Sequence, residues 1–399
     1  MNRFGAAVAA ALLLATVLAG PVGAAGPGDG VVVNGLANPR GLAFSADGKL
    51  YVAEAGQAGD VCFAGVGTEE GGPLCAGFSG RISRVDTAAG TRNDYISGLL
   101  SIGGPLFAIG ATGTAVQGNQ VYGLMGANDI ALPPAAACGG GTACQAVVAA
   151  AQMQAGHLLR GVPSGGYAWK QDVGAFNYQW TVDNKATIGS GDPAYQPGWA
   201  DNPDFQPGDA NPYALATAPG GTYMVDGGSN TLTWVPQDGS PRVVAAFPQP
   251  VPPASESNPV PYDAVPTCVA PTASGVVVSD LHGRIFVVDG SSLTVAPATV
   301  ASQGGAFLVA AGGCATDGKG NVYISDIFVG SLVKLSLSTM TMSWVRGPGT
   351  FNFATGVAVA RDGTVYVANN GVCPSFPTPV GPDNPCGGVT GEIVRVVMP

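Results

Sequence analysis

The stretch Gly356-Val-Ala-Val-Ala-Arg-Asp-Gly363, continued after one residue by Val365-Tyr-Val-Ala-Asn369, decides the fold of this 399-residue chain. It consists of a short apolar strand, a turn centred on Asp-Gly, and a second strand in which aromatic and aliphatic residues alternate. That pattern is typical of a β-hairpin. Six copies of the unit run along the chain, and the other five begin at Gly41, Leu106, Ala214, Cys268 and Cys314.

Further strands are expected in each copy. Third strands are predicted at residues 80–85, 156–160, 230–235, 283–288, 330–335 and 391–396. Fourth strands are predicted at residues 93–97, 167–172, 242–247 and 341–345. The second copy is the least regular. Its first strand is predicted at residues 106–109 and its second at 121–125, with an extended turn over residues 111–120.

The last copy lacks a fourth strand, whereas a spare strand, Val31-Val-Val-Asn-Gly-Leu36, lies near the N-terminus. A ring of sheets closes when such a strand completes the last sheet, and closure removes the exposed edges of an open array. A two-sheet sandwich also contains many short strands, but it does not predict six matched units. We therefore predict an all-β fold, a single six-bladed β-propeller over residues 26–399, closed by its N-terminal strand.

Residues 1–25 have the features of an export signal. Arg3 gives a positive start, residues 6–18 are mostly apolar, and Val22-Gly-Ala24 is a small-residue cleavage pattern. An uncleaved anchor is the alternative, although the apolar stretch is short and no later segment reaches the length of a membrane span. The 8 cysteines, an even number, are typical of an oxidising compartment. We expect a secreted protein, extracellular or periplasmic, without a membrane span after signal removal.

Charge and histidine content narrow the classes of function. The net charge is −10 and 11% of the residues are charged, whereas nucleic-acid binding requires a basic face. Two histidines, His157 and His282, leave little for histidine-based metal or general-base chemistry. The sequence also lacks nucleophile-elbow, phosphate-loop and calcium-loop motifs. We expect a monomer without a nucleic-acid partner, and the missing motifs favour a protein that is not an enzyme.

The long connections are expected on one face. In a propeller, the loops from strand two to strand three and from strand four to the next strand one share a face. The five longest connections are of these kinds and cover residues 55–78, 126–155, 174–210, 248–264 and 370–390. Loops held on a rigid scaffold tend to carry function, although loops also lengthen by drift. We expect a small molecule or a protein partner on this face, which we call the loop face.

The cysteines form three local pairs and one distant pair. The local pairs are Cys62 with Cys75, Cys138 with Cys144, and Cys373 with Cys386. Each is expected to form a disulfide that closes its own loop, because no histidine or second cysteine pair nearby completes a zinc site. Cys268 and Cys314 share a register on the inner strands of adjacent copies, where either a disulfide or two buried thiols fits the sequence.

Five polar residues end the second strands of their copies, at the loop face. They are Glu54, Asp226, Asp280, Asp326 and Asn369, and Met125 takes the place in the second copy. Five oxygen-bearing side chains around the loop-face mouth of the central channel could bind a hard cation such as Ca²⁺ or hold paired carboxylates for acid–base chemistry. The alternative is structural: a carboxylate at a strand end commonly accepts hydrogen bonds from the next turn and repeats because the unit repeats.

Other candidates open at the same mouth. Arg40 precedes the first inner strand, where it could pair with an anionic ligand or with Glu54. His282 follows Asp280 closely and lacks a partner in the sequence for base chemistry, so it is expected as a polar loop residue. Aromatic residues of segment 192–211 are expected to form a stiff lid that stacks on a ligand or plugs the channel. They are Tyr195, Trp199 and Phe205.

Two stretches, Leu36-Ala-Asn-Pro-Arg-Gly-Leu-Ala-Phe44 and Leu50-Tyr-Val-Ala-Glu-Ala-Gly56, resemble the opening of ScyD/ScyE family proteins. So do the cysteine-containing loop that leads to Gly80-Arg-Ile-Ser-Arg-Val-Asp86 and the unit Asn211-Pro-Tyr-Ala-Leu-Ala216. The resemblance spans nearly the whole mature chain and implies an exported six-bladed propeller related to NHL repeats, without a settled activity. It also implies that the acid ending strand two is largely structural. Segment 174–210 departs from the family pattern, so no ligand is carried over.

Two main functions follow from these observations. The favoured one is a secreted binding or scaffold propeller that uses the loop face for an unassigned ligand. The alternative is a calcium-dependent hydrolase or lactonase that resembles gluconolactonase- and paraoxonase-type propellers. A quinone-dependent sugar dehydrogenase is disfavoured by the two histidines. Convergence of three or more of the strand-end oxygens on one point, at about 2.3–2.6 Å, would favour calcium.

Overall fold

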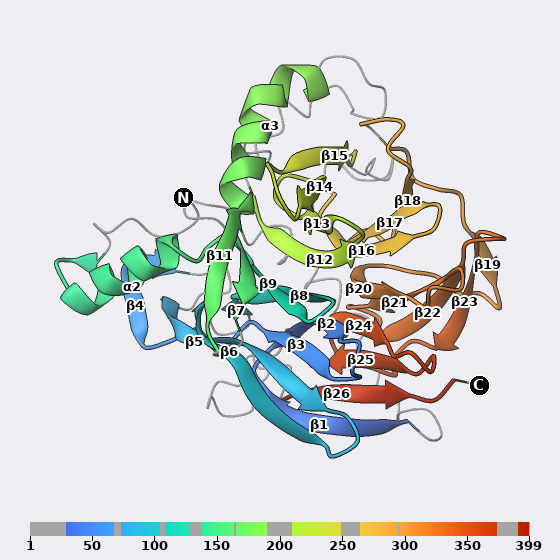
Figure 1. Ribbon diagram of the computed structural model, residues 1–399, viewed down its shortest axis with the longest axis horizontal. Coiled ribbons are helices and arrows are strands. Elements are labelled where there is room, and N and C mark those ends of the chain that lie inside the picture. Colours follow the sequence, from blue (N-terminus) through green and yellow to red (C-terminus); the bar gives the residue numbers. More distant parts are fainter. Residues whose placement is uncertain are drawn as a thin grey trace.

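The computed structural model describes residues 29–67, 73–103, 108–127, 138–162, 165–189, 210–248, 264–293, 295–372 and 390–398. Within these ranges, six small sheets stand around a common centre as the blades of a β-propeller (Figure 1). Each sheet runs from an inner strand beside the channel to an outer strand at the rim. The predicted fold class is therefore confirmed.

The blades are numbered here in chain order. Blade one contains β2 (Pro39–Phe44), β3 (Leu50–Glu54), β5 (Pro73–Asp86) and β6 (Thr91–Gly103), with β4 (Val61–Gly67) and β7 (Ala108–Ile109) added. Blade two contains β8 (Ala111–Gln117), β9 (Gln120–Met125), β10 (His157–Gly161) and β11 (Tyr167–Asp172). Blade three contains β12 (Pro212–Ala218), β13 (Gly221–Asp226), β14 (Thr231–Pro236) and β15 (Arg242–Ala246).

The second half of the ring is less uniform. Blade four has three strands, β16 (Pro266–Thr272), β17 (Gly275–Asp280) and β18 (Ile285–Val288). Blade five contains β20 (Ala311–Thr316), β21 (Asn321–Asp326), β22 (Ser331–Ser336) and β23 (Thr341–Arg346). The short β19 (Ala301–Gln303) pairs in parallel with β23, so it joins blade five. Blade six contains β24 (Gly356–Val359), β25 (Val365–Asn369) and β26 (Gly391–Val396).

The N-terminal strand completes blade six. β1 (Gly30–Leu36) pairs antiparallel with β26, which confirms the predicted closure (Figure 1). Next to this junction, Nη2 and Nε of Arg346 lie 2.6 and 2.7 Å from the two carboxylate oxygens of Asp29. The Val397 peptide N–H donates to the same carboxylate at 2.8 Å. This cluster links the segments next to the first and last strands to blade five.

The inner strands approach one another closely. A Cβ atom on Gly313 would lie 2.3 Å from the carbonyl oxygen of Thr355 in blade six. A Cβ atom on Gly356 would lie 2.0 Å from the carbonyl oxygen of Arg40 in blade one. Glycine at both positions therefore allows the backbones to meet, and the channel is narrow as a result.

Threonine hydroxyl groups connect alternate pairs of blades beside the channel. Thr112 of β8 donates to the carbonyl oxygen of Pro212 at 3.1 Å, Thr267 of β16 to Ala311 at 2.5 Å, and Thr355 to Pro39 at 2.7 Å. Each hydroxyl joins one blade to the inner strand of the next. Because each hydroxyl donates its proton to a carbonyl oxygen, the three threonines hold neighbouring blades together and have no hydroxyl proton left to donate to a ligand in the channel.

Blade two corrects one prediction. Its inner strand is β8 and lies at residues 111–117, which were predicted as part of an extended turn. The predicted first strand at 106–109 is described only at its last two residues, which form β7 and pair with β6 of blade one. Strand β8 begins Ala-Thr-Gly-Thr-Ala, so it lacks the apolar alternation that identified the other copies. Small residues are needed there because inner strands crowd the channel.

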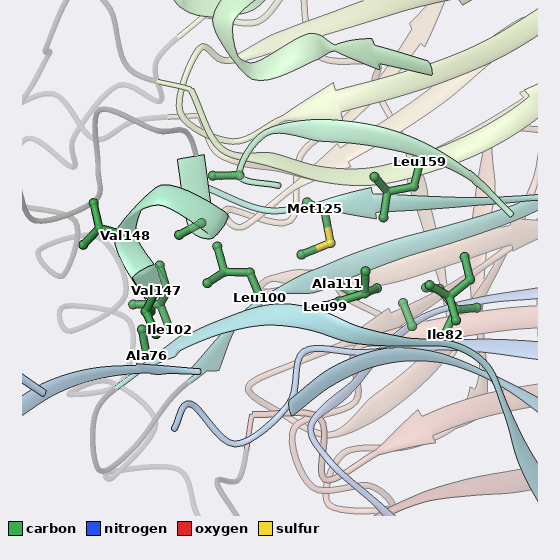
Figure 2. Packing of buried hydrophobic residues seen from close by; sticks show 14 of the residues in the cluster. Ala76, Ile82, Leu99, Leu100, Ile102, Ala111, Met125, Val147, Val148 and Leu159 are labelled. Atoms are coloured by element: carbon green, nitrogen blue, oxygen red, sulfur yellow. The ribbon is translucent and has the colours of Figure 1, made fainter. Parts of the chain in front are cut away.

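Several connections predicted as long loops contain regular structure. Strand β4 pairs with an extended β5 in the first connection, α2 (Thr142–Gln152) lies in the second, and α3 (Val173–Gly189) begins the third. Neither helix was predicted. Figure 2 shows Val147 of α2 next to Ile102 and Ala76, which belong to the extended parts of β6 and β5. The hydrophobic core of blades one and two thus continues into the loop-face additions. Of the helices in the described ranges, neither is long and apolar enough to cross a membrane.

Three disulfides are present in the described residues. Cys62–Cys75 joins β4 to β5, and Cys138–Cys144 joins the segment before α2 to its first turn, as predicted. The open question at Cys268 and Cys314 is resolved as a disulfide, with the Cα atoms 5.2 Å apart. It links the inner strands of blades four and five. The predicted pair Cys373–Cys386 lies outside the described residues.

Candidate functional site

The strand-end residues lie where expected. Glu54, Asp226, Asp280, Asp326 and Asn369 are the last residues of β3, β13, β17, β21 and β25, and all five are buried. The direction in which their oxygens point decides between a shared cation site and separate structural roles.

Asp326 shows the structural role most completely. Its Oδ1 accepts hydrogen bonds from the peptide N–H groups of Phe328 and Val329, each at 3.0 Å. Its Oδ2 accepts from the N–H groups of Val309 at 2.6 Å and Ala310 at 3.1 Å. The carboxylate therefore holds the turn after β21 against the segment that leads into β20. Burial raises the pKa of Asp326, and the four backbone donors oppose that rise.

Asp226 makes the equivalent contacts in blade three. Its Oδ1 accepts from the N–H groups of Asn211 at 2.7 Å, Gly228 at 3.0 Å and Ser229 at 2.9 Å. Its Oδ2 accepts from Nδ2 of Asn177 in α3 at 2.8 Å. Burial raises the pKa of Asp226, and these donors, with Asn177 first among them, oppose the rise. The strand-end acid of this blade therefore also anchors an added helix.

Glu54 and Asn369 follow the same pattern in blades one and six. Glu54 Oε2 accepts from the Ala37 N–H at 2.7 Å, and Nη1 of Arg92 lies 3.2 Å from the same oxygen. Asn369 Oδ1 accepts from the Asn352 N–H at 2.7 Å. In both blades the acceptor holds the segment that leads into the inner strand of its own blade.

Asp280 differs in its partners. Its Oδ1 accepts from the peptide N–H groups of His282 and Arg284, each at 3.0 Å. Nε and Nη2 of Arg284 lie 2.7 and 2.6 Å from Oδ2. Burial raises the pKa of Asp280, and the charge of Arg284 opposes that rise. His282 is exposed; its peptide N–H donates to Asp280, and the charge of its side chain also opposes the rise in the Asp280 pKa.

These contacts do not fit a calcium site. In blades one, three, five and six, the strand-end residue accepts from N–H groups 15 to 17 positions earlier in the chain, within its own blade. The oxygens needed by a hard cation are therefore directed at peptide donors in separate blades. In the described part of the chain, no group of three or more His, Cys, Asp or Glu side chains is arranged to hold a metal ion. The geometry favours the structural interpretation of the acids.

Arg40 occupies a different environment. It follows the first residue of β2, is 8% exposed, and lines the central channel together with residues from all six inner strands. Its Nη2 donates to the Ala108 carbonyl oxygen at 3.1 Å, so the guanidinium does not pair with Glu54 in the way that sequence reasoning allowed. Burial lowers the pKa of Arg40, and the neighbouring Tyr213 opposes that effect.

The channel itself is narrow. Its volume is about 30 Å³, close to the share of one water molecule in the liquid. A large ligand therefore has no room between the inner strands and would have to lie above them. The aromatic candidates for such a position, Tyr195, Trp199 and Phe205, lie outside the described residues.

Sequence reasoning missed two residues that hold the additions in place. Asn177 of α3 is fully buried, and it connects Asp226 to Thr233, whose hydroxyl donates to Asn177 Oδ1 at 2.8 Å. Gln154, just after α2, accepts from the Leu100 N–H at 2.5 Å. A polar residue between aromatic residues, as in Phe176-Asn177-Tyr178, was the available signal for a buried contact.

Comparisons with known proteins identify the fold. No family model and no curated protein matches the chain. Among solved structures, the chain is similar to a putative oxidoreductase (glucose dehydrogenase) from Thermus thermophilus, with a TM-score of 0.50 and 16% identity over 92% of this chain and 99% of that one. It is also similar to a gluconolactonase from Xanthomonas campestris, with a TM-score of 0.50 and 10% identity over 92% and 89% of the two chains. At these identities the likeness defines a class of fold, the six-bladed β-propeller.

Proposed function

We propose that this protein is an exported binding propeller, not an enzyme, and that its ligand or partner is bound on the loop face. The observation that carries the proposal is the way the loop-face additions are anchored. Asn177 ties α3 to blade three, Gln154 ties the end of α2 to blade one, and a disulfide ties β4 to β5. Loops that had lengthened by drift would not be expected to form buried hydrogen bonds with the blades.

The alternative, a calcium-dependent lactonase, is weaker for a physical reason. The gluconolactonase of known structure shares the propeller fold at 10% identity, which supports no carry-over of activity. The strand-end acids accept hydrogen bonds from backbone groups, so binding a cation there would require those bonds to break. We also propose, from the motifs around residues 36–56, that the protein is a ScyD/ScyE family member that acts outside the cytoplasm.

A panel of sugars, aldonic acids and aldonolactones tests the proposal. The mature protein is screened by thermal denaturation with each compound, and lactone hydrolysis is followed in parallel with CaCl2 and with EGTA. We expect at least one compound to raise the Tm without being consumed. Calcium-dependent lactone hydrolysis, or a Tm that no compound changes, would contradict a binding role for ligands of this kind.

Matched variants locate the binding face. Met153, next to α2, is an exposed apolar residue on the loop face, whereas the exposed Val31 lies near the start of β1, at the end of that strand away from the loop face. We expect Met153→Glu to weaken a ligand-induced rise in Tm and Val31→Glu to leave it unchanged. The reverse order would place the ligand on the other face.

A further inference from the structure

Arg40 is a buried cation without a carboxylate partner in the described part of the chain. Among the described residues that line the channel, it is the one with a charged side chain. The chain contains 26 acidic residues, but Glu54, Asp226, Asp280 and Asp326 hold the loops of their own blades, as shown above. One guanidinium nitrogen donates to the Ala108 carbonyl oxygen, and a carbonyl oxygen carries no charge to balance the cation.

Such a charge is costly to bury unless an anion accompanies it. Removal of a charged group from water is unfavourable, and the lost hydration is recovered only through a good ionic partner. The lowered pKa of Arg40 reflects the same desolvation. A counter-ion in the channel mouth would restore the favourable interaction without any change in the fold.

The other groups at the mouth suit an anion. Tyr213 takes the place in β12 that Arg40 takes in β2, and its phenol lies near enough to oppose the lowering of the Arg40 pKa. The threonine hydroxyls along the channel already donate to carbonyl oxygens, as described above. The guanidinium N–H groups and the Tyr213 hydroxyl therefore supply the donors that face the channel.

Size limits what can bind. A channel of about 30 Å³ has room for about one water-sized group, so it can take a halide ion, or one oxygen of a carboxylate group whose remaining atoms lie in the channel mouth. A planar guanidinium is well matched to a carboxylate, because two parallel N–H groups meet the two oxygens.

We propose that the loop-face mouth of the channel is a binding site for a small monovalent anion, a chloride ion or the carboxylate end of an organic ligand, held by Arg40 and Tyr213. For an organic ligand, this site rests on the proposed binding function, because the carboxylate would belong to the ligand of the loop face. For chloride it does not, because a chloride ion would bind whether or not a larger ligand exists.

Chloride-35 NMR line broadening on the mature protein tests the site. We expect wild type to broaden the chloride resonance in a saturable way. Arg40→Gln should abolish at least nine-tenths of the effect, and Tyr213→Phe should weaken it several-fold. Arg361→Gln, which removes an exposed arginine from the turn between β24 and β25, serves as the matched control and should behave as wild type.

Acetate distinguishes the two sources of the anion. If sodium acetate removes the Arg40-dependent broadening, the site accepts a carboxylate. If it does not, the site is specific for an inorganic anion. The proposal is overturned if wild type neither broadens chloride in an Arg40-dependent way nor binds acetate by calorimetry.

Two further controls keep the result interpretable. Should Arg40→Gln fail to fold, Arg40→Lys, which keeps the charge but loses the planar donor pair, should retain chloride and bind acetate more weakly. The compound panel with Met153→Glu does not involve Arg40. If no Arg40-dependent anion binding is found, the proposal of ligand binding on the loop face is unaffected. If no compound of the panel raises the Tm, the chloride result is unaffected.

Discussion

At the scale of single residues, the chain uses carboxylates as backbone connectors. Asp326 accepts four peptide N–H groups from two segments that are far apart in the sequence. A buried peptide N–H without an acceptor is costly, and one carboxylate satisfies several of them at once. The repetition of acids at strand ends follows from the repetition of this local need.

Replacement of Asp326 should therefore lower stability whether or not metal is present. Asp326→Asn keeps the shape of the side chain but directs an amide NH2 group at two peptide donors. We expect a loss of about 2–4 kcal/mol in the free energy of unfolding, measured by urea denaturation. The exposed Asp60→Asn is the matched control, with an expected change within about 0.5 kcal/mol. An Asp326→Asn variant as stable as Asp60→Asn would refute the structural role.

Asp86 gives a prediction of pH dependence. The Lys49 ammonium lies 2.5 Å from its Oδ2 and, with the N–H groups of Ala88 and Ala89, lowers the pKa of Asp86 from 3.8 to about 2. A lowered folded-state pKa contributes stability that is present above pH 3.8 and is lost as the pH falls through 2.

Asp86→Asn should then be less stable than wild type at pH 7, and the difference should close as the pH falls from 4 to 2. Urea denaturation of both proteins across this range measures the difference in their free energies of unfolding. The other carboxyl groups titrate alike in both proteins, so their contributions cancel in that difference. A difference that stays constant down to pH 2 would show that the charge of Asp86 is not responsible.

At the scale of elements, α3 is held to blade three by polar residues. Asn177 and Thr181 are buried, whereas Phe176 and Trp180 on another side of the helix are partly exposed. The apolar Val173, at the start of the helix, is also buried. A helix usually buries a side that is apolar throughout, so the position of α3 depends in addition on the hydrogen bonds of Asn177 with Asp226 and Thr233.

Loss of Asn177 should release α3 from the blade. We expect Asn177→Ala to cost about 1–3 kcal/mol of stability and to speed amide hydrogen exchange throughout the helix. Gln179→Ala, at an exposed position of the same helix, is the control and should leave exchange unchanged. Equal exchange in the two variants would mean that other contacts hold α3.

These elements also show what the sequence could predict. Six copies of one hairpin specified the blades, and the spare strand at Val31 specified the closure, because both are local patterns that repeat. Strand β8 was missed because close packing of backbones selects small residues, which carry no alternation. Helix α3 was missed because its buried side carries the polar Asn177 and Thr181 after the apolar Val173. The hydrogen bonds of Asp226, and the lack of a carboxylate partner for Arg40 among the described residues, depend on segments far apart in the chain, so no local pattern revealed them.

At the scale of the whole molecule, the ring depends on its closure. β1 covers the edge of β26, and Asp29, just before β1, pairs with Arg346 of blade five. The Asp29 side chain is fully buried, so removal of Arg346 would take two charged hydrogen bonds away from a buried carboxylate.

Arg346→Met should therefore weaken the closure. We expect a loss of about 3 kcal/mol in the free energy of unfolding, and association of molecules through the exposed edge of β26 as β1 detaches. Urea denaturation and size-exclusion chromatography measure the two effects. Arg395→Gln, at an exposed site on β26, is the control. Unchanged stability in Arg346→Met would show that strand pairing alone closes the ring.

The central claim is that the strand-end acids hold the loop face together without a cation. The most direct test is the Tm of the wild-type protein, stripped of metal with EGTA and then returned to millimolar CaCl2. We predict the same Tm in both conditions, because the oxygens of Glu54, Asp226, Asp280 and Asp326 already accept hydrogen bonds from the chain. A Tm that falls by several degrees in EGTA and recovers with calcium would contradict the account.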